Sequence, residues 1–441
     1  SGGFKALTRA ESDTSVSTSV TTALGRTTSY LQLRAPDGTD RRVDIDPAGL
    51  ATMTERKANG TTAVTSPDSV VATLTETPDP RFGMQAAVAS AFNVRTPSGL
   101  QLSGSTSRRT TLTNPTDPLS LTSQTDSLVV NGRSFKSVFD AAARTLTATS
   151  AEGRQAVTQL DTLGRVVEER AAGVAPVKYG YGPRGFVTTI TQPGRVLRYD
   201  YDSSGRVKQV TDPLGRFEQY AYDSAGRVVK QTLFNGREIL YGYDANGNLT
   251  SLTPPGRPAH TFAYAAANLD SAYSPPPAGL PVSATRYTFN LDRQLTRVLR
   301  PDSLAIDVAY DTAGRPSTLT LPNGQVQFAY SPTSGNLTQL TAPDGGTLNY
   351  TYDGSLPKTV TWAGAVQGSV GFAYDSDFRV SKIAVNGTDS VAFAYDKDNL
   401  LTSAGAMTLT RDPLSGRLVR TVLGSDTSTW TYDDSTGVVT H

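Results

Sequence analysis

The sequence contains no cysteine and only two histidines, His260 and His441. The absence of cysteine excludes disulfide bonds, a thiolate nucleophile and any metal or cluster held by thiolates. A lone histidine at either place cannot supply the two or three imidazoles of the usual zinc site, and a serine–histidine pair would depend on one of these two residues. We therefore expect no catalytic residue, no cofactor and no metal site.

Charge and hydrophobicity are also low. Charged residues make up 18% of the chain, against about 25% in an average domain. The 41 basic and 40 acidic residues leave a net charge of +1, so no overall field attracts nucleic acid or an anionic membrane. A hydrophobic content of 37% argues against one thick core. No run approaches the roughly 18 apolar residues of a membrane span, and the start of the chain has no apolar signal core, so we expect no membrane insertion by this chain.

What the chain does contain is a repeat. Of its 19 tyrosines, all but Tyr30 and Tyr273 lie at, or two residues before, an aromatic position that is followed by Asp and then Gly-Arg. This aromatic position recurs about every 21 residues. Including degenerate copies, in which the residue itself is not aromatic (Leu160 and Arg411), it falls at residues 139, 160, 181, 201, 222, 243, 264, 289, 310, 330, 352, 374, 395, 411 and 432. The clearest copies predict structural repeat residues at Tyr201, Asp202, Gly205, Arg206, Tyr222, Asp223, Gly226, Arg227, Tyr243, Asp244, Gly247, Tyr310, Asp311, Gly314 and Arg315.

Each repeat is predicted to be one β-hairpin. The Asp-x-x-Gly-Arg stretch is one turn signal, and a Pro-Gly, Pro-x-Gly or Asn-Gly stretch is a second. Between these turns the side chains of residues 217–222 alternate with the period of two that is typical of a strand. We therefore predict an all-β fold, a long antiparallel ribbon of hairpins that must coil, because twisted sheets rarely exceed about ten strands without curling.

Two regions are predicted. Residues 1–138 are rich in Thr and Ser, with short strands but no clear period, and residues 139–441 carry the hairpin array. Residues 84–95 are expected to form a short helix. The proline-rich insertion at 273–281 is expected to project as a loop.

The Tyr-Asp-x-x-Gly-Arg units resemble the YD-repeat, or Rhs-repeat, family, which includes bacterial Rhs toxin shells, shell subunits of insecticidal toxin complexes and teneurins. Residues 79–85 look like the entry segment that precedes the repeats in such proteins. The resemblance implies a spiralling β-sheet that forms a hollow shell or part of one, secreted or displayed on a cell surface. In bacterial members such a shell encloses a C-terminal toxin, and in teneurins it supports adhesion. The Asp-Pro core of self-cleaving shells is only echoed at residues 412–416.

Several candidate sites have simpler structural explanations. Asp200 with Asp202 could form an acid–base pair, as could Asp433 with Asp434, but aspartate recurs at the turn position of most repeats and is predicted to cap turns. Residues 180–185 match Gly-x-Gly-x-x-Gly with no helix after them to bind a phosphate. The interleaved Arg and Tyr residues could stack on bases, yet each arginine lies near an aspartate. His260 is expected to be an ordinary strand residue.

The predicted function is therefore a non-enzymatic shell module that encapsulates a cargo or toxin domain not present in this chain. The alternative is a surface module for recognition or adhesion that binds a glycan or protein receptor, and a carbohydrate-active enzyme ranks third. The expected partners are the rest of the parent shell or an enclosed C-terminal domain, and not nucleic acid. The expected location is secreted or cell-surface, with a bacterial origin.

Two local expectations concern packing and edges. Tyr222 and Tyr243 should lie on strands two apart, with Val228 or a neighbour between them. Residues 429–441 should form a final hairpin whose outer strand has no charge or proline to block pairing, so we expect either that the parent protein continues or that this edge pairs with another molecule.

Overall fold

The computed structural model describes residues 3–276 and 284–441, and every regular element in these ranges is a β-strand. The 39 strands belong to one sheet. The first fourteen are β1 (Lys5–Glu11), β2 (Ser15–Thr22), β3 (Thr27–Arg34), β4 (Asp40–Ile45), β5 (Ala51–Arg56), β6 (Thr61–Thr65), β7 (Val71–Asp79), β8 (Gly83–Arg95), β9 (Gln101–Leu112), β10 (Leu121–Val130), β11 (Arg133–Asp140), β12 (Thr145–Thr149), β13 (Gln155–Leu160) and β14 (Val166–Ala171).

The next fourteen strands are β15 (Val174–Tyr181), β16 (Val187–Gln192), β17 (Arg195–Tyr201), β18 (Val207–Thr211), β19 (Phe217–Tyr222), β20 (Val228–Thr232), β21 (Glu238–Tyr243), β22 (Leu249–Thr253), β23 (His260–Tyr264), β24 (Asp270–Ser274), β25 (Thr285–Phe289), β26 (Leu295–Leu299), β27 (Ala305–Tyr310) and β28 (Pro316–Leu321). The last are β29 (Gly324–Tyr330), β30 (Leu337–Thr341), β31 (Thr347–Asp353), β32 (Leu356–Ala363), β33 (Gly368–Tyr374), β34 (Val380–Val385), β35 (Asp389–Tyr395), β36 (Leu401–Ala404), β37 (Met407–Arg411), β38 (Leu418–Leu423) and β39 (Asp426–Thr429).

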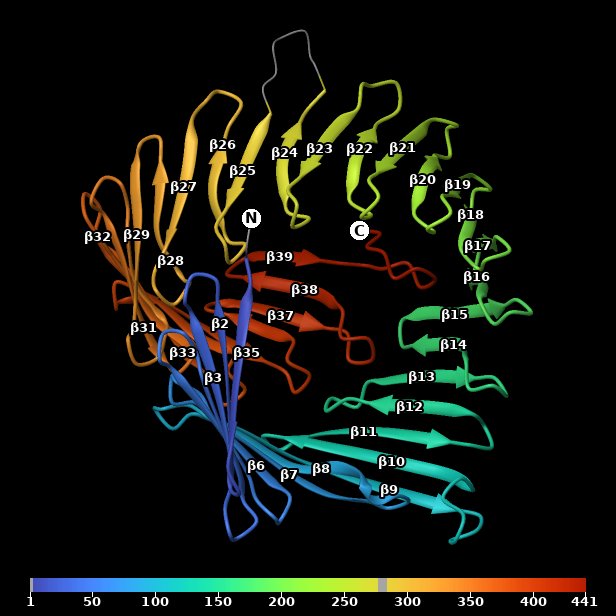
Figure 1. Ribbon diagram of the computed structural model, residues 1–441. Coiled ribbons are helices and arrows are strands. Elements are labelled where there is room, and N and C mark those ends of the chain that lie inside the picture. Colours follow the sequence, from blue (N-terminus) through green and yellow to red (C-terminus); the bar gives the residue numbers. More distant parts are fainter. Residues whose placement is uncertain (1–2, 277–283) are drawn as a thin grey trace. The chain divides into compact units, whose positions relative to one another are not determined.

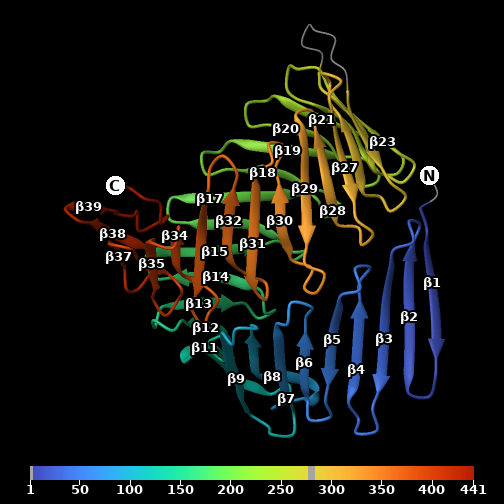
Figure 2. The same ribbon diagram turned by 90° about the vertical axis from the view of Figure 1, so that its left-hand side faces the viewer.

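The chain divides into two compact units. Unit 1 consists of Ser1–Ala6, Thr21–Arg26 and Val177–Gln327, and unit 2 consists of Leu7–Val20, Thr27–Pro176 and Phe328–His441. Within unit 1, strands β16 to β28 stand side by side in one curved row, green to orange in Figure 1. Within unit 2, the turns next to β31 lie against the turn between β8 and β9, as Figure 2 shows for the orange and blue strands.

Strands that follow one another along the chain pair antiparallel, so each repeat is one hairpin, as predicted. A shift of register occurs at the aromatic position, for example where Tyr222 pairs with Val228 after Ala221 has paired with Lys230. Such a β-bulge bends the strand and increases its twist. The same shift precedes residues 160, 181, 201, 222, 243, 264, 289, 310, 352, 374, 395 and 411, which gives the ribbon a regular source of curvature.

The expected helix at residues 84–95 is wrong, because this segment is strand β8. It pairs with β7 on one side, where Val71 lies opposite Arg95, and with β9 on the other. Two long antiparallel ladders satisfy its main-chain groups on both sides, and this tertiary pairing overrides the helical preference of its alanines.

The sheet has almost no interior. Among the described residues, the buried hydrophobic core consists of Leu50, which is 9% exposed. The buried polar residues are Asp79, Thr96 and Asp353, and Gly354 and Gly416 are buried as well. The absence of a thick core, expected from composition, is thus confirmed, and polar contacts between turns occupy the most enclosed places.

Three further predictions concern the final hairpin, the proline-rich insertion and the boundary between the two predicted regions. Residues 432 and 439 form a bridge in the final hairpin, and Thr440 N donates a hydrogen bond to Thr431 O at 2.9 Å. The insertion predicted to project at 273–281 lies partly outside the described residues, so it stays a prediction. The expected boundary at residues 138/139 also stays a prediction.

Candidate functional site

The repeat turn is closed by its own aspartate and arginine. In the turn between β19 and β20, the Asp223 carboxylate accepts hydrogen bonds from the main-chain N–H groups of Ala225 and Arg227, both at 2.9 Å. Its second oxygen lies 2.8 Å from Arg227 Nε and 2.7 Å from Arg227 Nη2. Gly226 has φ of 83°, a backbone conformation that costs glycine little. We call this arrangement the cis clasp.

The cis clasp also holds the next repeat. The Arg227 guanidinium lies over the Tyr243 ring, 4.7 Å from its centroid, and its Nη1 donates to Asp244 O at 3.1 Å. Arg206 makes the same pair of contacts with the following repeat, 4.5 Å from the Tyr222 ring centroid and 3.3 Å from Asp223 O. The arginine of each of these repeats therefore links two turns through a charged hydrogen bond and a cation–π contact.

The repeat tyrosine links neighbouring strands. Its hydroxyl donates to a main-chain carbonyl of the preceding strand, as in the bond from Tyr222 to Val207 O at 2.6 Å. Val207 is the residue opposite the bulge at Tyr201, so each tyrosine reaches the point where the previous repeat's ladder is interrupted. The same bond, 2.6 to 3.0 Å long, joins Tyr201–Val187, Tyr243–Val228, Tyr264–Leu249, Tyr310–Leu295, Tyr352–Leu337, Tyr374–Pro357, Tyr395–Val380 and Tyr432–Leu418.

The remaining predicted repeat residues have the same geometry with small variations. Asp202 with Arg206, and Asp311 with Arg315, form cis clasps with Asp–Arg distances of 2.7 and 2.8 Å. In the turn of Asp244, Asn248 takes the place of the arginine and donates through its side-chain amide at 2.9 Å. The repeat glycines all have positive φ: Gly205 (85°), Gly226 (83°), Gly247 (91°) and Gly314 (89°).

Val228 lies between Tyr222 and Tyr243, as expected. It pairs with Tyr222 across the bulge, and its carbonyl accepts the Tyr243 hydroxyl. Both tyrosines are only half-buried, so this face of the sheet is partly open to solvent.

A second kind of clasp joins turns that are far apart in the sequence. In unit 2, the Asp398 carboxylate accepts from Ser150 Oγ at 2.6 Å, from Glu152 N at 3.0 Å and from Arg154 Nη1 at 2.5 Å. Arg154 Nη2 donates to Asp396 at 2.9 Å. The three donors are the first, third and fifth residues of one turn, at residues 150–154. We call such a turn a receiving turn, and we call its contact with a distant aspartate a trans clasp.

The same trans clasp occurs in unit 1. Asp292 accepts from Thr22 Oγ1 at 2.7 Å, from Leu24 N at 3.2 Å and from Arg26 Nη1 at 2.8 Å. These three donors are again the first, third and fifth residues of a turn, at residues 22–26. Arg26 also donates to Gln294, which stands where other repeats carry their own arginine. An arginine 266 residues away thus replaces the missing arginine of this repeat.

Two further trans contacts in unit 2 use part of this pattern. Asp353 accepts from Thr96 Oγ1 at 2.6 Å and Ser98 N at 2.8 Å, the first and third residues of the turn at 96–100. Asp377 accepts from Arg133 Nη2 at 2.5 Å and from Asn131 Nδ2 at 2.7 Å. Four aspartates of later repeats are therefore bound by four turns of earlier strands.

The trans clasps are better shielded than the cis clasps. The side chains of Arg26, Arg133 and Arg154 are 10%, 14% and 15% exposed. Those of Arg206 and Arg227 are 34% and 31% exposed. Because water screens exposed ion pairs more strongly, removing one partner should cost more free energy in a trans clasp.

Sequence reasoning missed the trans clasps, although a signal for them exists. The arginine-bound aspartates Asp292, Asp377 and Asp398 each lie three residues after the aromatic position of their repeat. Aspartate stands at this third position in only these three of the fifteen repeats. The partner segments could not be paired with them from sequence, because the contacts span 244 to 266 residues.

Hydrogen bonding lowers the pKa of the two carboxylates Asp398 and Asp353 in unit 2. Burial acts to raise the pKa of Asp398, but the hydrogen bonds from Ser150, Glu152 and Arg154 outweigh it, and the pKa lies below its ordinary value. The pKa of Asp353 is lowered in the same way, by Ser98 and Thr96 against the effect of burial. Such carboxylates stay charged at neutral pH and accept hydrogen bonds, which makes them poor general acids.

The other candidates have structural explanations. Asp202 caps its turn through the N–H groups of Ser204 and Arg206. Asp433 caps the last hairpin turn, and bonds from Ser435 and Thr436 lower its pKa to about 2. Residues 180–185 end strand β15 and form a turn with no helix behind it. His260 lies in strand β23, with Nδ1 2.8 Å from the Tyr273 hydroxyl.

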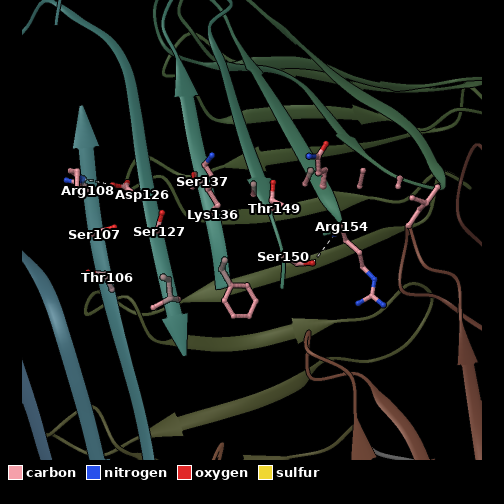
Figure 3. A pocket seen from close by; sticks show the side chains of 18 of the residues that line it. Thr106, Ser107, Arg108, Asp126, Ser127, Lys136, Ser137, Thr149, Ser150 and Arg154 are labelled. Carbon is pink, nitrogen blue, oxygen red and sulfur yellow. Dashed lines mark hydrogen bonds and ion pairs between the residues drawn. The ribbon is translucent and has the colours of Figure 1, made fainter. Parts of the chain in front are cut away.

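Unit 2 also has a concavity of about 810 Å³ on one face of strands β9 to β13. Arg108 and Asp126, which are 2.7 Å apart, belong to its lining, and Figure 3 shows them with Ser107, Ser127 and Ser137. Its remaining lining includes Leu128, Phe135, Thr149, Arg154, Ala156, Leu414 and Ser415. No cluster of metal-ligating side chains occurs among the residues described.

These features define a class. The chain is a β-hairpin repeat protein whose repeats are joined by tyrosine–carbonyl bonds and by aspartate–arginine clasps, with a sheet in place of a core. The family model for the Teneurin YD-shell matches residues 11–439, and the chain belongs to this family. A search of curated proteins found no match.

A solved structure shares the fold, and two others are more distantly similar. The crystal structure of TcdB2-TccC3-TEV is similar with a TM-score of 0.68 at 14% identity, over 99% of this chain and 27% of that one. TcdB2-TccC3-Cdc42 gives a TM-score of 0.41 at 12% identity, over 91% of this chain and 27% of that one. A Photorhabdus luminescens Tc holotoxin pore gives 0.34 at 11% identity, over 98% and 29%. The chain therefore spans about a quarter of the length of these structures.

No helix in the described ranges is long and apolar enough to cross a membrane.

Proposed function

We propose that the chain is a non-enzymatic segment of the wall of a hollow YD shell that encloses another polypeptide. The observation that carries this proposal is the combination of a YD-shell family match over residues 11–439 with a 39-stranded sheet that has almost no buried core. A single sheet layer with few buried side chains does not form a solid core. It is suited to form the wall of a hollow structure. The regular bulges at the aromatic positions supply the bending that a wall needs.

The chemistry of the repeat residues supports a structural role. The clasp aspartates are held as charged acceptors by N–H groups and arginines, and the repeat tyrosines have their hydroxyls bound to carbonyls. These side chains are engaged with the protein itself, so we infer that they hold neighbouring hairpins together. The proposed partners are further shell segments and an enclosed domain, in a secreted or surface-displayed protein.

The experiment is a protease-protection assay on the complete gene product. We expect a domain encoded beside the wall to resist proteinase K in the native protein. A variant with Arg26→Gln, Arg133→Gln and Arg154→Gln should open the wall and expose that domain at the same protease concentration. A matched control, Arg198→Gln, Arg286→Gln and Arg420→Gln, removes the same charge from exposed strand arginines and should preserve protection. Equal digestion of the domain in native protein and both variants would contradict encapsulation.

Surface recognition is the second candidate, and the concavity in unit 2 favours it. An opening of about 810 Å³ that combines Phe135 with serine and threonine hydroxyls is suited to a polar ligand with one apolar face. A glycan array probed with the purified chain tests this role. Binding that Phe135→Ala abolishes would support recognition, and no binding above background would leave the wall as the sole function.

A further inference from the structure

Two successive repeats of unit 1 lack the arginine of the cis clasp. Asn248 stands at the arginine position of one repeat, and Leu269 stands there in the next. In complete repeats this guanidinium lies over the aromatic ring of the following repeat, 4.5 and 4.7 Å from the ring centroid. The rings that follow the two incomplete repeats are those of Tyr264 and Phe289, and no cation among the described residues lies over either of them.

A third incomplete repeat shows how such a ring takes a cation. Gln294 stands at its arginine position, and the following ring is that of Tyr310. The guanidinium of Arg26, from a distant turn, lies 6.0 Å from the Tyr310 ring centroid. The same guanidinium binds Asp292 at 2.8 Å. An aromatic ring and a carboxylate together therefore hold a guanidinium that the repeat itself does not supply.

An unusual carboxylate lies beside the two uncovered rings. In eleven of the twelve bulges at the aromatic positions, the residue opposite is valine, leucine or proline, and the exception is Asp270, opposite Tyr264. Asp270 thus occupies, between Tyr264 and Phe289, the place that Val228 occupies in its own repeat. It is exposed, and it forms no ion pair with any residue that the structure describes. The eleven other residues are Val166, Val187, Val207, Val228, Leu249, Leu295, Pro316, Pro357, Val380, Leu401 and Leu418.

The uncovered rings and this carboxylate line one concavity of unit 1. It has a volume of about 490 Å³ and lies among strands β22 to β26, which stand side by side in Figure 1. Asp270 is the one charged residue of its lining. Burial raises the pKa of the Tyr264 hydroxyl, and the charge of Asp270 adds to this rise, so the carboxylate acts directly on this side chain. Five aromatic rings line the concavity, those of Phe262, Tyr264, Tyr273, Tyr287 and Phe289.

We propose that this concavity is a binding site for a guanidinium group, which stacks on Tyr264 and Phe289 and pairs with Asp270. Aromatic faces attract positive charge, and a carboxylate binds the planar guanidinium through two parallel hydrogen bonds. A volume of about 490 Å³ also admits the alkyl stem behind the guanidinium, against the remaining rings. The ligand is an arginine side chain of another polypeptide or a small alkylguanidine, which share this chemistry. The site does not depend on the proposed role of the chain as a wall.

The test is a ligand-observed NMR titration of the purified chain with N-acetyl-arginine amide, whose guanidinium is its only charge. The matched ligand is N-acetyl-citrulline amide, in which a neutral urea group of nearly the same shape replaces the guanidinium. We expect the arginine compound to bind about tenfold more tightly, because only a charged group pairs with Asp270. Butylguanidine distinguishes the two sources. Weaker binding than that of the arginine compound identifies a polypeptide, and equal or tighter binding identifies a small alkylguanidine.

Variants of the chain locate the site. Asp270→Asn should lower the affinity for the arginine compound about tenfold, and Asp270→Glu should restore most of it. Leu269→Arg returns a guanidinium to the usual position beside Phe289, so it should occupy the site from within and lower the affinity to a similar extent. The matched control is Asp200→Asn, which removes the same charge from an exposed strand position of unit 1. It should change the affinity by less than about twofold.

Circular dichroism should show all four variants folded, so that a loss of affinity reports the site. Three results would each overturn the proposal. They are absence of binding of the arginine compound to the native chain, equal binding of the citrulline compound, and equal affinities of the Asp270→Asn and Asp200→Asn variants.

Discussion

Arg154 and Asp398 lie 244 residues apart in the sequence and 2.5 Å apart in the fold. Both side chains are shielded, at 15% and 11% exposure. The contact has the same donors, in the same order, as the contact between Arg26 and Asp292 in unit 1. The cis clasps of the repeat aspartates lie in turns that lead from an odd-numbered to an even-numbered strand, whereas the turns that bind these distant aspartates lead from an even-numbered to an odd-numbered strand.

Removing the trans arginine should destabilise more than removing a cis arginine. Arg154→Gln leaves Asp396 and Asp398 largely shielded without their cation, and breaking a buried pair costs roughly 3–5 kcal/mol. Arg227→Gln, in a more exposed clasp, should cost about 0–1 kcal/mol. Urea unfolding monitored by hydrogen exchange measures both. Equal costs for the two variants would show that shielding does not distinguish the clasps.

An arginine supplied in cis should compete with the trans arginine. Leu400 occupies the place of the repeat arginine in the repeat of Tyr395. We expect Leu400→Arg to bind Asp396 within its own turn and to displace Arg154 from Asp396, so that Asp398 alone holds Arg154, because a local contact closes a much shorter loop. Hydrogen exchange at residues 150–156 should rise while residues 396–400 stay protected. Unchanged exchange at 150–156 would contradict this competition.

Two glycine-to-alanine substitutions separate the cost of backbone strain from the cost of a steric clash with Leu50. Gly345 and Gly335 have φ of 82° and 79°, so alanine at either position is strained by about 1–2 kcal/mol. A Cβ at Gly345 meets no atom within 4 Å, whereas one at Gly335 would lie 2.6 Å from Leu50 Cδ1. Gly335→Ala should therefore lower the thermal midpoint more than Gly345→Ala. The double variant with Leu50→Ala should recover part of the difference, and a failure to recover any would show that Leu50 is not the obstacle.

The trans clasps of unit 2 should weaken in acid. The pKa values of Asp398 and Asp353 are lowered in the folded protein, so their contribution is complete above the unfolded value of about 4 and is lost as pH falls through the folded values. Exchange at residues 96–100 and 150–154 should rise as the pH falls below about 4. Asp398→Asn should flatten this pH dependence at 150–154 and leave it unchanged at 96–100. An unaltered pH dependence at 150–154 in this variant would contradict the assignment.

The tyrosine hydroxyls should matter separately from the rings. Tyr222→Phe removes the bond to Val207 O and should cost about 1 kcal/mol. Tyr222→Ala should cost more, because it also removes the surface on which Arg206 stacks. Since Tyr222 is half-buried, we expect less than the roughly 3–5 kcal/mol of a fully buried aromatic. Chemical unfolding of the two variants measures the difference, and identical costs would mean that the ring contributes nothing.

Much of the local structure could be read from the sequence. The spacing of Tyr-Asp and Gly-Arg predicted hairpins of about 21 residues, the turn-capping role of aspartates such as Asp223, and the position of Val228 between two tyrosines, and each is present. These features depend on contacts within one or two hairpins, so nearby residues determine them. The helix expected at residues 84–95 was wrong, because pairing with β7 and β9 overrides a weak local preference.

The sequence by itself determined the repeat, the hairpin and the thinness of the sheet, because turn chemistry, strand alternation and low hydrophobic content act locally or through composition. Only the tertiary structure decided which turns meet across 244 to 266 residues. That choice depends on the curvature accumulated over many bulged hairpins, and no single repeat contains it. Asp292 and Asp398 were visible as departures from the repeat, but their partners Arg26 and Arg154 became known only when the fold brought them together.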